Sequence, residues 1–545
     1  MSTLYPQKTK VMVGLSSCGK AAGAARVYER LEEGLSGVEE VALGRTGCLG
    51  FCSMEPLVEV IEPSGRSTVY QKVSEETADE LASALGKGEV PDLGVMAQRS
   101  HRGEGAELSS IPFYRQQRRI VLRNCGLGNP ESVQEYVALG GYFTLWRALT
   151  GFTPEEVIEE IKASNLRGRG GAGFPTGLKW HFLRREEAEP KYLVCNADEG
   201  DPGAYMDRTL LEGDPFSVIE GMTIGAYATG ASKGFIYVRA EYPLAVMRIE
   251  NALKRARKQG LLGKNILGQG FDFDIEIKMG AGAFVCGEET ALMASIESER
   301  GMPRPRPPFP AQSGLWGKPT NINNVETWAN IPRIIEGGAE WFASVGTERS
   351  GGTKVFSITG DVVNTGLVEV PLGTTLRDMV FEIGGGVTGG EFKAVQTGGP
   401  SGGVIPESEL DTPIDYENLA ALGSIMGSGG VIVMNSHTCM VDMARFFLEF
   451  TQDESCGKCT PCRVGTKRIL EILERFTRGE AKEEDLEKLE HLSRYVKESA
   501  LCALGGTAPN PVLSTLRFFR DEYLAHLEGK CPADRCFKET REGLQ

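Results

Sequence analysis

The sequence contains no unbroken apolar run of the roughly 18 residues that a membrane-spanning helix needs. It is also poor in positive charge, since 59 Lys and Arg residues face 74 Asp and Glu residues, for a formal net charge of −15. Nucleic-acid backbones require a basic surface, so this balance argues against a nucleic-acid partner. We therefore expect a cytoplasmic protein with no membrane span and no nucleic-acid partner.

A secretory signal is also missing. The basic residues Lys8 and Lys10 precede an apolar stretch that covers only Val11–Leu15, shorter than the roughly 7–15 residues of a signal-peptide core. A short strand followed by a loop explains this stretch better. Thirteen cysteines in such a chain indicate metal or redox sites rather than disulfides.

The stretch Leu166–Trp180, LRGRGGAGFPTGLKW, holds five glycines within ten residues. Glycines let the backbone approach a ligand and turn its N–H groups onto phosphate oxygens. Arg167, Arg169 and Lys179 add positive charge, while Phe174 and Trp180 offer flat surfaces for a planar ring. A surface turn is the alternative for a lone loop of this kind.

Polar loops follow two predicted strands downstream. After Lys191–Val194 comes NADEGDPGAYMDR, whose carboxylates could accept hydrogen bonds from ribityl or ribose hydroxyls, or could form a solvated acidic turn. After Phe271–Lys278 comes GAGAFVCGEETAL, where two glutamates stand at an apparent helix start and capping could explain one of them. The proline-rich segment Arg300–Thr327 then supplies several asparagines.

The last hundred residues have helical periodicity, predicted over Cys439–Phe450, Thr466–Thr477, Glu483–Glu498 and Pro511–His526. Cys456, Cys459 and Cys462 form C-x2-C-x2-C, and Cys502 follows after a helical hairpin. This spacing indicates [4Fe–4S] ligation, because structural zinc more often uses two separated pairs.

A zinc site is a second hypothesis for the end of the chain. His526, Cys531 and Cys536 lie at intervals of five, and Cys439 is the unassigned cysteine best placed to join them. One histidine and three cysteines suit tetrahedral zinc. The alternative is a frayed tail with two free thiols.

The first ninety residues resemble the thioredoxin-like ferredoxins, with strands at Val11–Leu15 and Leu57–Ile61 and helices at Ala21–Leu35 and Ser74–Leu85. That family binds a [2Fe–2S] cluster with four cysteines, and Cys18, Cys48 and Cys52 match three of them. Val13 stands at the fourth position. Either the cluster has another fourth ligand, or the fold persists without a stable cluster.

The predicted fold class is a multidomain α/β protein. Its predicted domains are a thioredoxin-like ferredoxin domain (1–90), a linker (91–138), a Rossmann-like α/β domain that contains the glycine loop (139–345), a β-grasp-like (SLBB-type) module without chemistry of its own (346–436), a helical bundle with a [4Fe–4S] cluster (437–530) and a cysteine-bearing tail (531–545). In the β-grasp-like module, short strands alternate with glycine turns and one helix near Thr375–Ile383.

Together the glycine loop, NADEGDPGAYMDR, GAGAFVCGEETAL, GKPTNINNVET and ESCGKCTPC with LCALG resemble the flavin-bearing, NADH-oxidising subunit of respiratory complex I. Its relatives include the diaphorase subunits of NAD-linked hydrogenases and formate dehydrogenases. The similarity covers roughly residues 140–530. The N-terminal module and the cysteine-bearing tail look most like the β subunit of electron-bifurcating hydrogenases.

The resemblance implies one FMN, held by Gly168, Arg169, Gly170, Gly171, Ala172, Gly173, Lys179, Asn196, Asp198, Glu199, Gly287, Glu288, Glu289, Asn323 and Asn324. It also implies that NADH lies against the flavin near Phe174, Asp201, Arg306 and Phe309, with help from Glu199. Asp201 stands where complex I subunits carry glutamate, and Arg306 where some carry lysine. A hydride would pass between nicotinamide and flavin, and single electrons between flavin and the [4Fe–4S] cluster.

The resemblance implies partners as well: a hydrogenase catalytic subunit, a small thioredoxin-like [2Fe–2S] subunit and ferredoxin. The crowded acidic residues favour NAD(H) over NADPH, whose additional phosphate they would repel. Two alternatives remain open, namely the equivalent subunit of a formate dehydrogenase or complex I, and an iron–sulfur scaffold whose flavin pocket stays empty.

Overall fold

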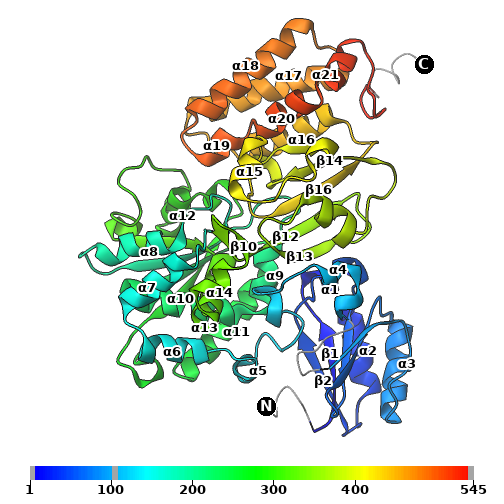
Figure 1. Ribbon diagram of the computed structural model, residues 1–545, viewed down its shortest axis with the longest axis vertical. Helices are drawn as coiled ribbons and strands as arrows, with labels where there is room; N and C mark the ends of the chain where they lie inside the picture. Colours follow the sequence, from blue (N-terminus) through cyan, green and yellow to red (C-terminus); the bar gives the residue numbers. More distant parts are fainter. Residues whose placement is uncertain (1–6, 101–107, 538–545) are drawn as a thin grey trace.

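A computed structural model describes residues 7–100 and 108–537 of the chain. Residues 101–107 of the predicted linker and 538–545 of the predicted tail lie outside this description. The fold is mixed α/β and multidomain, with three large sheets, one short two-stranded sheet and a C-terminal set of helices (Figure 1). Within the described residues, every helix is too short or too polar to cross a bilayer.

The N-terminal sheet has the order β2-β1-β3-β4-β5, with β1 parallel to β2 and the other pairs antiparallel. Its strands are β1 (Thr9–Gly14), β2 (Val41–Thr46), β3 (Val58–Ile61), β4 (Arg66–Tyr70) and β5 (Val95–Ser100). Apolar residues of the strands pack against α2 (Ala24–Gly34) and α3 (Glu75–Gly86). The prediction of one helix over Ala21–Leu35 is wrong, because Gly23, at φ 104°, separates α1 (Ser17–Ala21) from α2.

The prediction of an irregular linker over 91–138 is wrong for its first part. β5 pairs with β4 and buries Ala97, because the backbone groups of β4 need partners that a polar sequence pattern does not reveal. Two short helices follow, α4 (Pro112–Arg115) and α5 (Val133–Ala138). Phe113 of α4 stacks on Phe51 at 4.0 Å between ring centroids, so this stretch packs back onto the N-terminal module.

The second sheet is fully parallel, in the order β8-β7-β6-β9. Its strands are β6 (Tyr192–Ala197), β7 (Lys233–Arg239), β8 (Asp274–Gly280) and β9 (Thr320–Asn324). The surrounding helices are α6 (Phe143–Gly151), α7 (Pro154–Ala163), α8 (Thr176–Arg185), α9 (Met206–Gly213), α10 (Pro215–Thr229), α11 (Pro243–Lys258), α12 (Glu289–Ile296), α13 (Val325–Gly337) and α14 (Ala339–Ala343). Such sheets carry ligands at the carboxyl ends of their strands.

The third sheet follows a short hairpin of β10 (Gly346–Thr347) and β11 (Ser350–Gly351). Its order is β13-β12-β16-β14-β15, with a parallel central pair β12–β16 and antiparallel pairs elsewhere. The strands are β12 (Thr353–Gly360), β13 (Gly366–Pro371), β14 (Phe392–Thr397), β15 (Val404–Pro406) and β16 (Gly430–Asn435). α15 (Tyr416–Ala421) and a π-helical turn η7 (Asp378–Ile383) connect them.

The C-terminal helices lie beyond the third sheet, drawn in orange and red in Figure 1. They are α16 (Met440–Asp453), α17 (Lys467–Arg478), α18 (Glu483–Ser499), α19 (Ala503–Thr507), α20 (Asn510–Phe518) and α21 (Arg520–Leu527). The single helix predicted over Pro511–His526 is divided at Phe519, whose φ of −132° is not helical.

Candidate functional site

The glycine loop lies between α7 and α8, at the carboxyl end of β9. Its two ends pair at Arg167 and Pro175, and the Gly168 N–H donates to the Phe174 carbonyl at 2.9 Å. Gly171 has a φ of 114°, and a Cβ there would lie 3.0 Å from the backbone of Gly427. A larger residue would therefore have to displace the loop from the third sheet.

Arg169 is predicted to contact FMN, and its side chain is bound within the protein. The side chain is fully buried, and its guanidinium donates to three backbone carbonyls, including those of Thr353 (2.9 Å) and Gly351 (2.6 Å). Its backbone N–H donates to the Thr327 hydroxyl at 2.8 Å. Arg169 thus fastens the glycine loop to the rest of the protein.

The carboxyl end of β6 carries an unpartnered carboxylate. The Asn196 amide donates to the Gly287 carbonyl at 2.9 Å, and its oxygen accepts the Asp198 N–H at 3.0 Å. Asp198 is 7% exposed, and neither of its carboxylate oxygens has a hydrogen-bond partner. Burial raises the pKa of Asp198 to about 7. A buried acceptor of this kind is suited to a ligand's hydroxyl or ring N–H.

Three residues predicted to contact the flavin cap helices in this structure. The Glu199 carboxylate accepts two backbone N–H groups at the start of α9, at 3.0 and 3.1 Å. Glu288 caps α12 in the same way, at 3.0 and 2.9 Å. The Asn324 oxygen caps α13 at 3.0 Å, and its amide donates to both oxygens of Asp207. The side chains of Glu199, Glu288 and Asn324 therefore stabilise the first turns of α9, α12 and α13.

Lys179 and Glu289, predicted to contact FMN, and Arg306, predicted to contact NADH, form one ionic group. Lys179 lies 3.2 Å and Arg306 2.6 Å from separate oxygens of Glu289. Burial would raise the pKa of Glu289, but the two cations outweigh it and hold the pKa below its usual value. The Glu289 carboxylate therefore stays ionised at neutral pH.

Three other predicted residues have contrasting surroundings. Asn323 is buried, and its oxygen accepts hydrogen bonds from Trp180 (3.1 Å) and Asn321 (2.7 Å). Phe174 and Phe309 are 46% and 54% exposed. Exposed aromatic faces of this kind are free to pack against a planar ligand.

The third sheet contributes contacts that the sequence did not indicate. The Tyr416 hydroxyl donates to the Gly168 carbonyl at 2.8 Å, and Arg167 lies 4.3 Å above its ring. Ser428 donates to Asp201, whose pKa burial raises to about 6. This module, predicted to have no chemistry of its own, therefore holds both the glycine loop and the acidic loop. The glycines around Ser428 were the only local feature of the sequence that could have indicated this contact.

The three cysteines of the C-x2-C-x2-C pattern and Cys502 line one small cavity. The other lining residues are Val285, Pro303, Ser455, Lys458, Leu501 and Leu504. Val285 belongs to η5 (Phe284–Gly287), the turn whose last carbonyl accepts the Asn196 amide. One short turn thus lies between this cavity and Asp198, since a Cβ built on Gly287 would be 3.6 Å from the Asp198 carbonyl oxygen.

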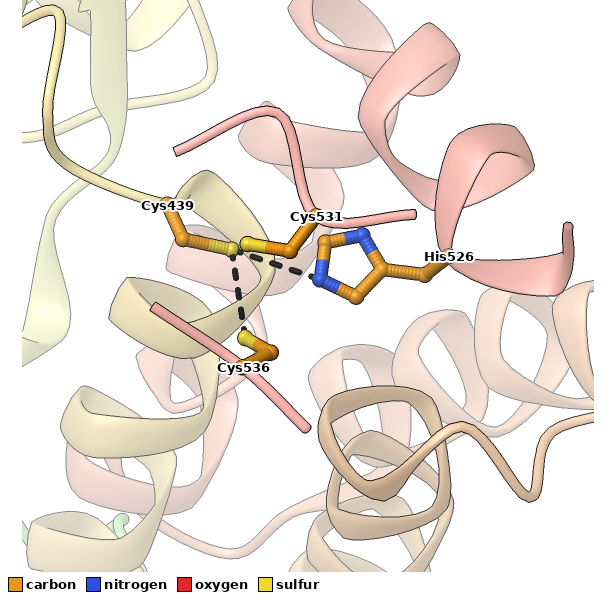
Figure 2. Close-up of side chains that lie close together, drawn as sticks. All are labelled: Cys439, His526, Cys531 and Cys536. Carbon is orange, nitrogen blue, oxygen red and sulfur yellow. Dashed lines mark hydrogen bonds between the residues drawn. The ribbon is translucent and has the colours of Figure 1, made fainter. Parts of the chain in front are cut away.

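A second set of cysteines is more compact. The ligand atoms of Cys439, His526, Cys531 and Cys536 all lie within 4.8 Å of one another, and the side chains converge from α16, α21 and the tail (Figure 2). Cys439 Sγ lies 3.5 Å from His526 Nε2 and 3.8 Å from Cys536 Sγ. His526 Nδ1 is hydrogen-bonded to the Glu522 carbonyl at 2.7 Å, which leaves Nε2 for a metal.

The three N-terminal cysteines gather where their module meets α9. Cys18 accepts a hydrogen bond from Arg208 at 3.7 Å, and Cys48 accepts the Gly50 N–H at 3.2 Å. Hydrogen bonds from Cys48 and Cys52, with the Arg208 charge, lower the pKa of Cys18 to about 3. All thirteen cysteines are free of disulfides.

Two family models match the chain. One, described as the Nuo51 FMN-binding domain, matches residues 161–333, and the other, described as the NADH-ubiquinone oxidoreductase-F iron-sulfur binding region, matches 442–526. The HndC component of the NADP-reducing hydrogenase of Solidesulfovibrio fructosivorans is 59% identical over 424 residues, or 77% of this chain and 86% of that one. An F-type component of the NADH-quinone oxidoreductase of Rhizobium meliloti is 47% identical over 76% of this chain and 99% of its own.

The chain belongs to this family of NADH-oxidising, FMN- and iron–sulfur-binding subunits. The crystal structure of an NAD+-reducing [NiFe]-hydrogenase in the H2-reduced state is also similar, with a TM-score of 0.67 and 30% identity over 96% of this chain and 87% of that one. These findings confirm the resemblance deduced from the motifs. The chain is an NADH dehydrogenase-type oxidoreductase subunit with an FMN-binding region and a [4Fe–4S] region.

The family models leave two cysteine sets outside their limits. The region 161–333 contains the glycine loop and Asp198, and 442–526 contains the four cavity cysteines. Cys18, Cys48 and Cys52 precede both regions. Cys439 lies before the second region, and Cys531 and Cys536 lie beyond it. The family matches therefore carry no information on what these two cysteine sets bind.

Proposed function

We propose that this chain is the NADH-oxidising subunit of an electron-bifurcating hydrogenase, in which electrons from hydrogen are divided between NAD+ and ferredoxin. The proposal depends on one observation above all. The turn η5 lines the cysteine cavity with Val285 and reaches the flavin crevice with the Gly287 carbonyl. A flavin and a [4Fe–4S] cluster on opposite sides of one turn would be close enough for direct electron exchange.

The residues around the crevice suit FMN. Asp198 offers two buried acceptors for ribityl hydroxyls or the ring N–H, and Lys179 adds a fixed positive charge. Phe174 and Phe309 offer exposed faces that would hold the dinucleotide. When bound, FMN accepts a hydride and releases electrons singly. Glu199, Glu288 and Asn324 serve this site through the helix starts that they cap.

We propose NAD(H) as the preferred dinucleotide, although one relative is an NADP-reducing hydrogenase subunit. Asp198, Glu199, Asp201, Glu288 and Glu289 give the crevice a negative field that would repel the additional phosphate of NADPH. Steady-state kinetics with both dinucleotides and an artificial acceptor test this point. A kcat/KM for NADPH equal to that for NADH would contradict it.

The proposed partners are a hydrogenase catalytic subunit, a small thioredoxin-like [2Fe–2S] subunit and ferredoxin. The similarity to the Solidesulfovibrio hydrogenase subunit and to the [NiFe]-hydrogenase structure supports this assembly. Free cysteines throughout the chain favour a reducing cytoplasm. A formate dehydrogenase or complex I would use the same NADH module.

Purification of the native complex tests the assignment. We expect a hydrogenase catalytic subunit to co-purify, with hydrogen-dependent NAD+ reduction that requires ferredoxin. A molybdenum or tungsten subunit with formate activity would keep the NADH module and overturn the hydrogenase assignment. A colourless preparation without FMN would instead favour the iron–sulfur scaffold.

We also propose a structural zinc ion bound by Cys439, His526, Cys531 and Cys536. A Zn–S bond of about 2.3 Å places the sulfurs of a tetrahedral site about 3.8 Å apart, and the Cys439–Cys536 distance is 3.8 Å. The cysteines of the [4Fe–4S] cavity do not form a set this compact, and a cubane cluster would hold its ligands farther apart.

Elemental analysis and one variant test the zinc proposal. We expect about one zinc per chain, and Cys536→Ser should lose it and lower the melting temperature by several degrees. Iron and FMN content should not change, because the cavity and crevice are separate from this site. Cys125→Ser, at a buried cysteine outside the set, is the matched control. Absence of zinc from the wild-type protein would contradict the proposal.

A further inference from the structure

The N-terminal cysteine site has a fourth polar group beside it. Glu55 follows the short helix η1 (Cys52–Met54) and is only 7% exposed. One carboxylate oxygen, Oε2, accepts the Leu57 N–H at 2.9 Å. The other, Oε1, is buried without a hydrogen-bond partner. A buried carboxylate oxygen left in this state costs free energy unless a ligand or ion satisfies it.

The carboxylate lies between the elements that carry the cysteines. A Cβ built on Gly14 would lie 3.4 and 3.6 Å from its two oxygens, and one on Gly19 would lie 3.2 Å from Oε2. Gly14 directly follows Val13, where thioredoxin-like ferredoxins carry a cysteine, and Gly19 directly follows Cys18. The Cys48 thiol is also close enough to interact directly with this carboxyl group. Glu55 therefore lies beside the end of β1 and beside the turn that carries Cys18.

We propose that Glu55 is the fourth protein ligand of a [2Fe–2S] cluster held by Cys18, Cys48 and Cys52. This inference rests on the proposal that the N-terminal module carries such a cluster. Three thiolates and one carboxylate bring the same total charge as four thiolates, so the core would be neutralised equally well. Carboxylate oxygen is an established iron ligand in other protein sites.

Two neighbours from the FMN-binding region complete the surroundings. Arg208 donates to Cys18 Sγ at 3.7 Å, and a cation there would stabilise a cluster thiolate. Tyr205 lies near Cys52, and its hydroxyl would donate a hydrogen bond to a cluster thiolate.

The test uses the full-length protein, with iron content and electron paramagnetic resonance of the reduced protein as readouts. We expect wild type to carry about six irons per chain, four in the cubane and two in the second cluster. Glu55→Ala and Glu55→Gln should lose about two irons and the two-iron signal. Glu55→Cys should restore both, with shifted g values because an oxygen ligand has become sulfur.

Glu59→Gln is the matched control, because Glu59 is a buried carboxylate (3% exposed) of the same module. It should keep about six irons and an unshifted signal. A wild-type chain with about four irons and no two-iron signal would overturn the inference. So would an unchanged signal in Glu55→Ala, or an unshifted one in Glu55→Cys.

Glu55→Cys tests the inference even if Glu55→Ala fails to fold. If the Glu55 carboxylate were only structural, a thiol in its place would not restore the two-iron signal with shifted g values. NADH-dependent dye reduction through FMN should persist in every folded variant. Its absence from the wild-type protein would count against the proposed function instead.

Discussion

Asp198, at the proposed flavin site, is buried with both carboxylate oxygens unpaired, so its negative charge destabilises the ligand-free protein. Burial raises its pKa to about 7 from an ordinary value of 3.8. A raised carboxyl pKa means that the folded state favours the protonated form. Stability from this group is therefore complete below pH 4 and declines as the pH rises to about 7, by at most about 4 kcal/mol.

We expect Asp198→Asn to make the FMN-free protein more stable than wild type at pH 8, because the amide carries no buried charge. The difference should shrink as the pH falls from 7 toward 5. FMN affinity should fall at the same time, because the amide offers one acceptor fewer. Thermal unfolding of the FMN-free protein across this pH range and FMN titration measure the two effects.

Glu276→Gln is a control for Asp198, because Glu276 of β8 is an exposed carboxylate in the same sheet. It should change neither property appreciably. Equal melting temperatures of Asp198→Asn and wild type at pH 8, together with equal FMN affinity, would contradict the assignment of Asp198 to the ligand.

The sequence indicated which polar residues gather near the proposed flavin site, but it did not indicate which group each side chain contacts. Lys179, Glu289 and Arg306 form the expected group because their charges attract one another. Glu199 and Asp198 are adjacent acidic residues of the same loop and looked equivalent in the sequence. Glu199 nevertheless caps α9, while the Asp198 carboxylate has no hydrogen-bond partner. Tyr416 supports the glycine loop from nearly 250 positions away, and no local pattern predicts such a contact.

At the scale of elements, a buried ion pair joins α13 to β12. Lys354 and Glu326 are both fully buried and paired. Lys354 also donates to the carbonyls of Val355 (2.8 Å) and Ser428 (2.7 Å), and Glu326 accepts the Val355 N–H at 2.9 Å. The pair links the helix that follows the flavin crevice to the third sheet.

Removal of either residue of the Lys354–Glu326 ion pair should lower the free energy of unfolding. Lys354→Met leaves the Glu326 carboxylate buried without its cation, and we expect a loss of about 3–5 kcal/mol in unfolding free energy. The double variant with Glu326→Leu should recover part of this loss. Urea unfolding measures both effects. Arg377→Met, in the exposed Arg377–Asp411 pair, should cost no more than about 1 kcal/mol. An additive double variant would mean that the two residues are not coupled.

Helices were predictable where the apolar periodicity and the residues at the helix ends indicate the same boundaries. The predicted helix Glu483–Glu498 corresponds to α18 (Glu483–Ser499), since acidic residues at its start and a regular apolar stripe act together. The break at Phe519 and the strand β5 were not predicted, because both depend on partners distant in sequence. β5 forms only because β4 presents an edge.

At the scale of the whole molecule, the N-terminal module is held against the other domains by buried polar contacts. Glu212 of α9 is 1% exposed and accepts the Ser17 N–H at 2.8 Å and the Ser17 hydroxyl at 2.5 Å. Arg248 of α11 donates to the Leu15 carbonyl at 2.8 Å. On the other side, the Gly50 carbonyl accepts the Leu367 N–H of the third sheet at 2.8 Å. The three cysteines therefore lie where three modules meet.

Glu212→Ala should loosen this junction without altering any cysteine. It leaves the Ser17 N–H without its acceptor at a buried interface, and we expect a cost of about 1–3 kcal/mol in module docking. Amide hydrogen exchange over residues 14–19 should accelerate roughly tenfold or more, while exchange in the parallel sheet stays unchanged. Asp272→Asn, in the exposed Lys264–Asp272 pair, should have no effect on either region. Unchanged exchange at residues 14–19 in Glu212→Ala would show that the module does not depend on this contact for its position.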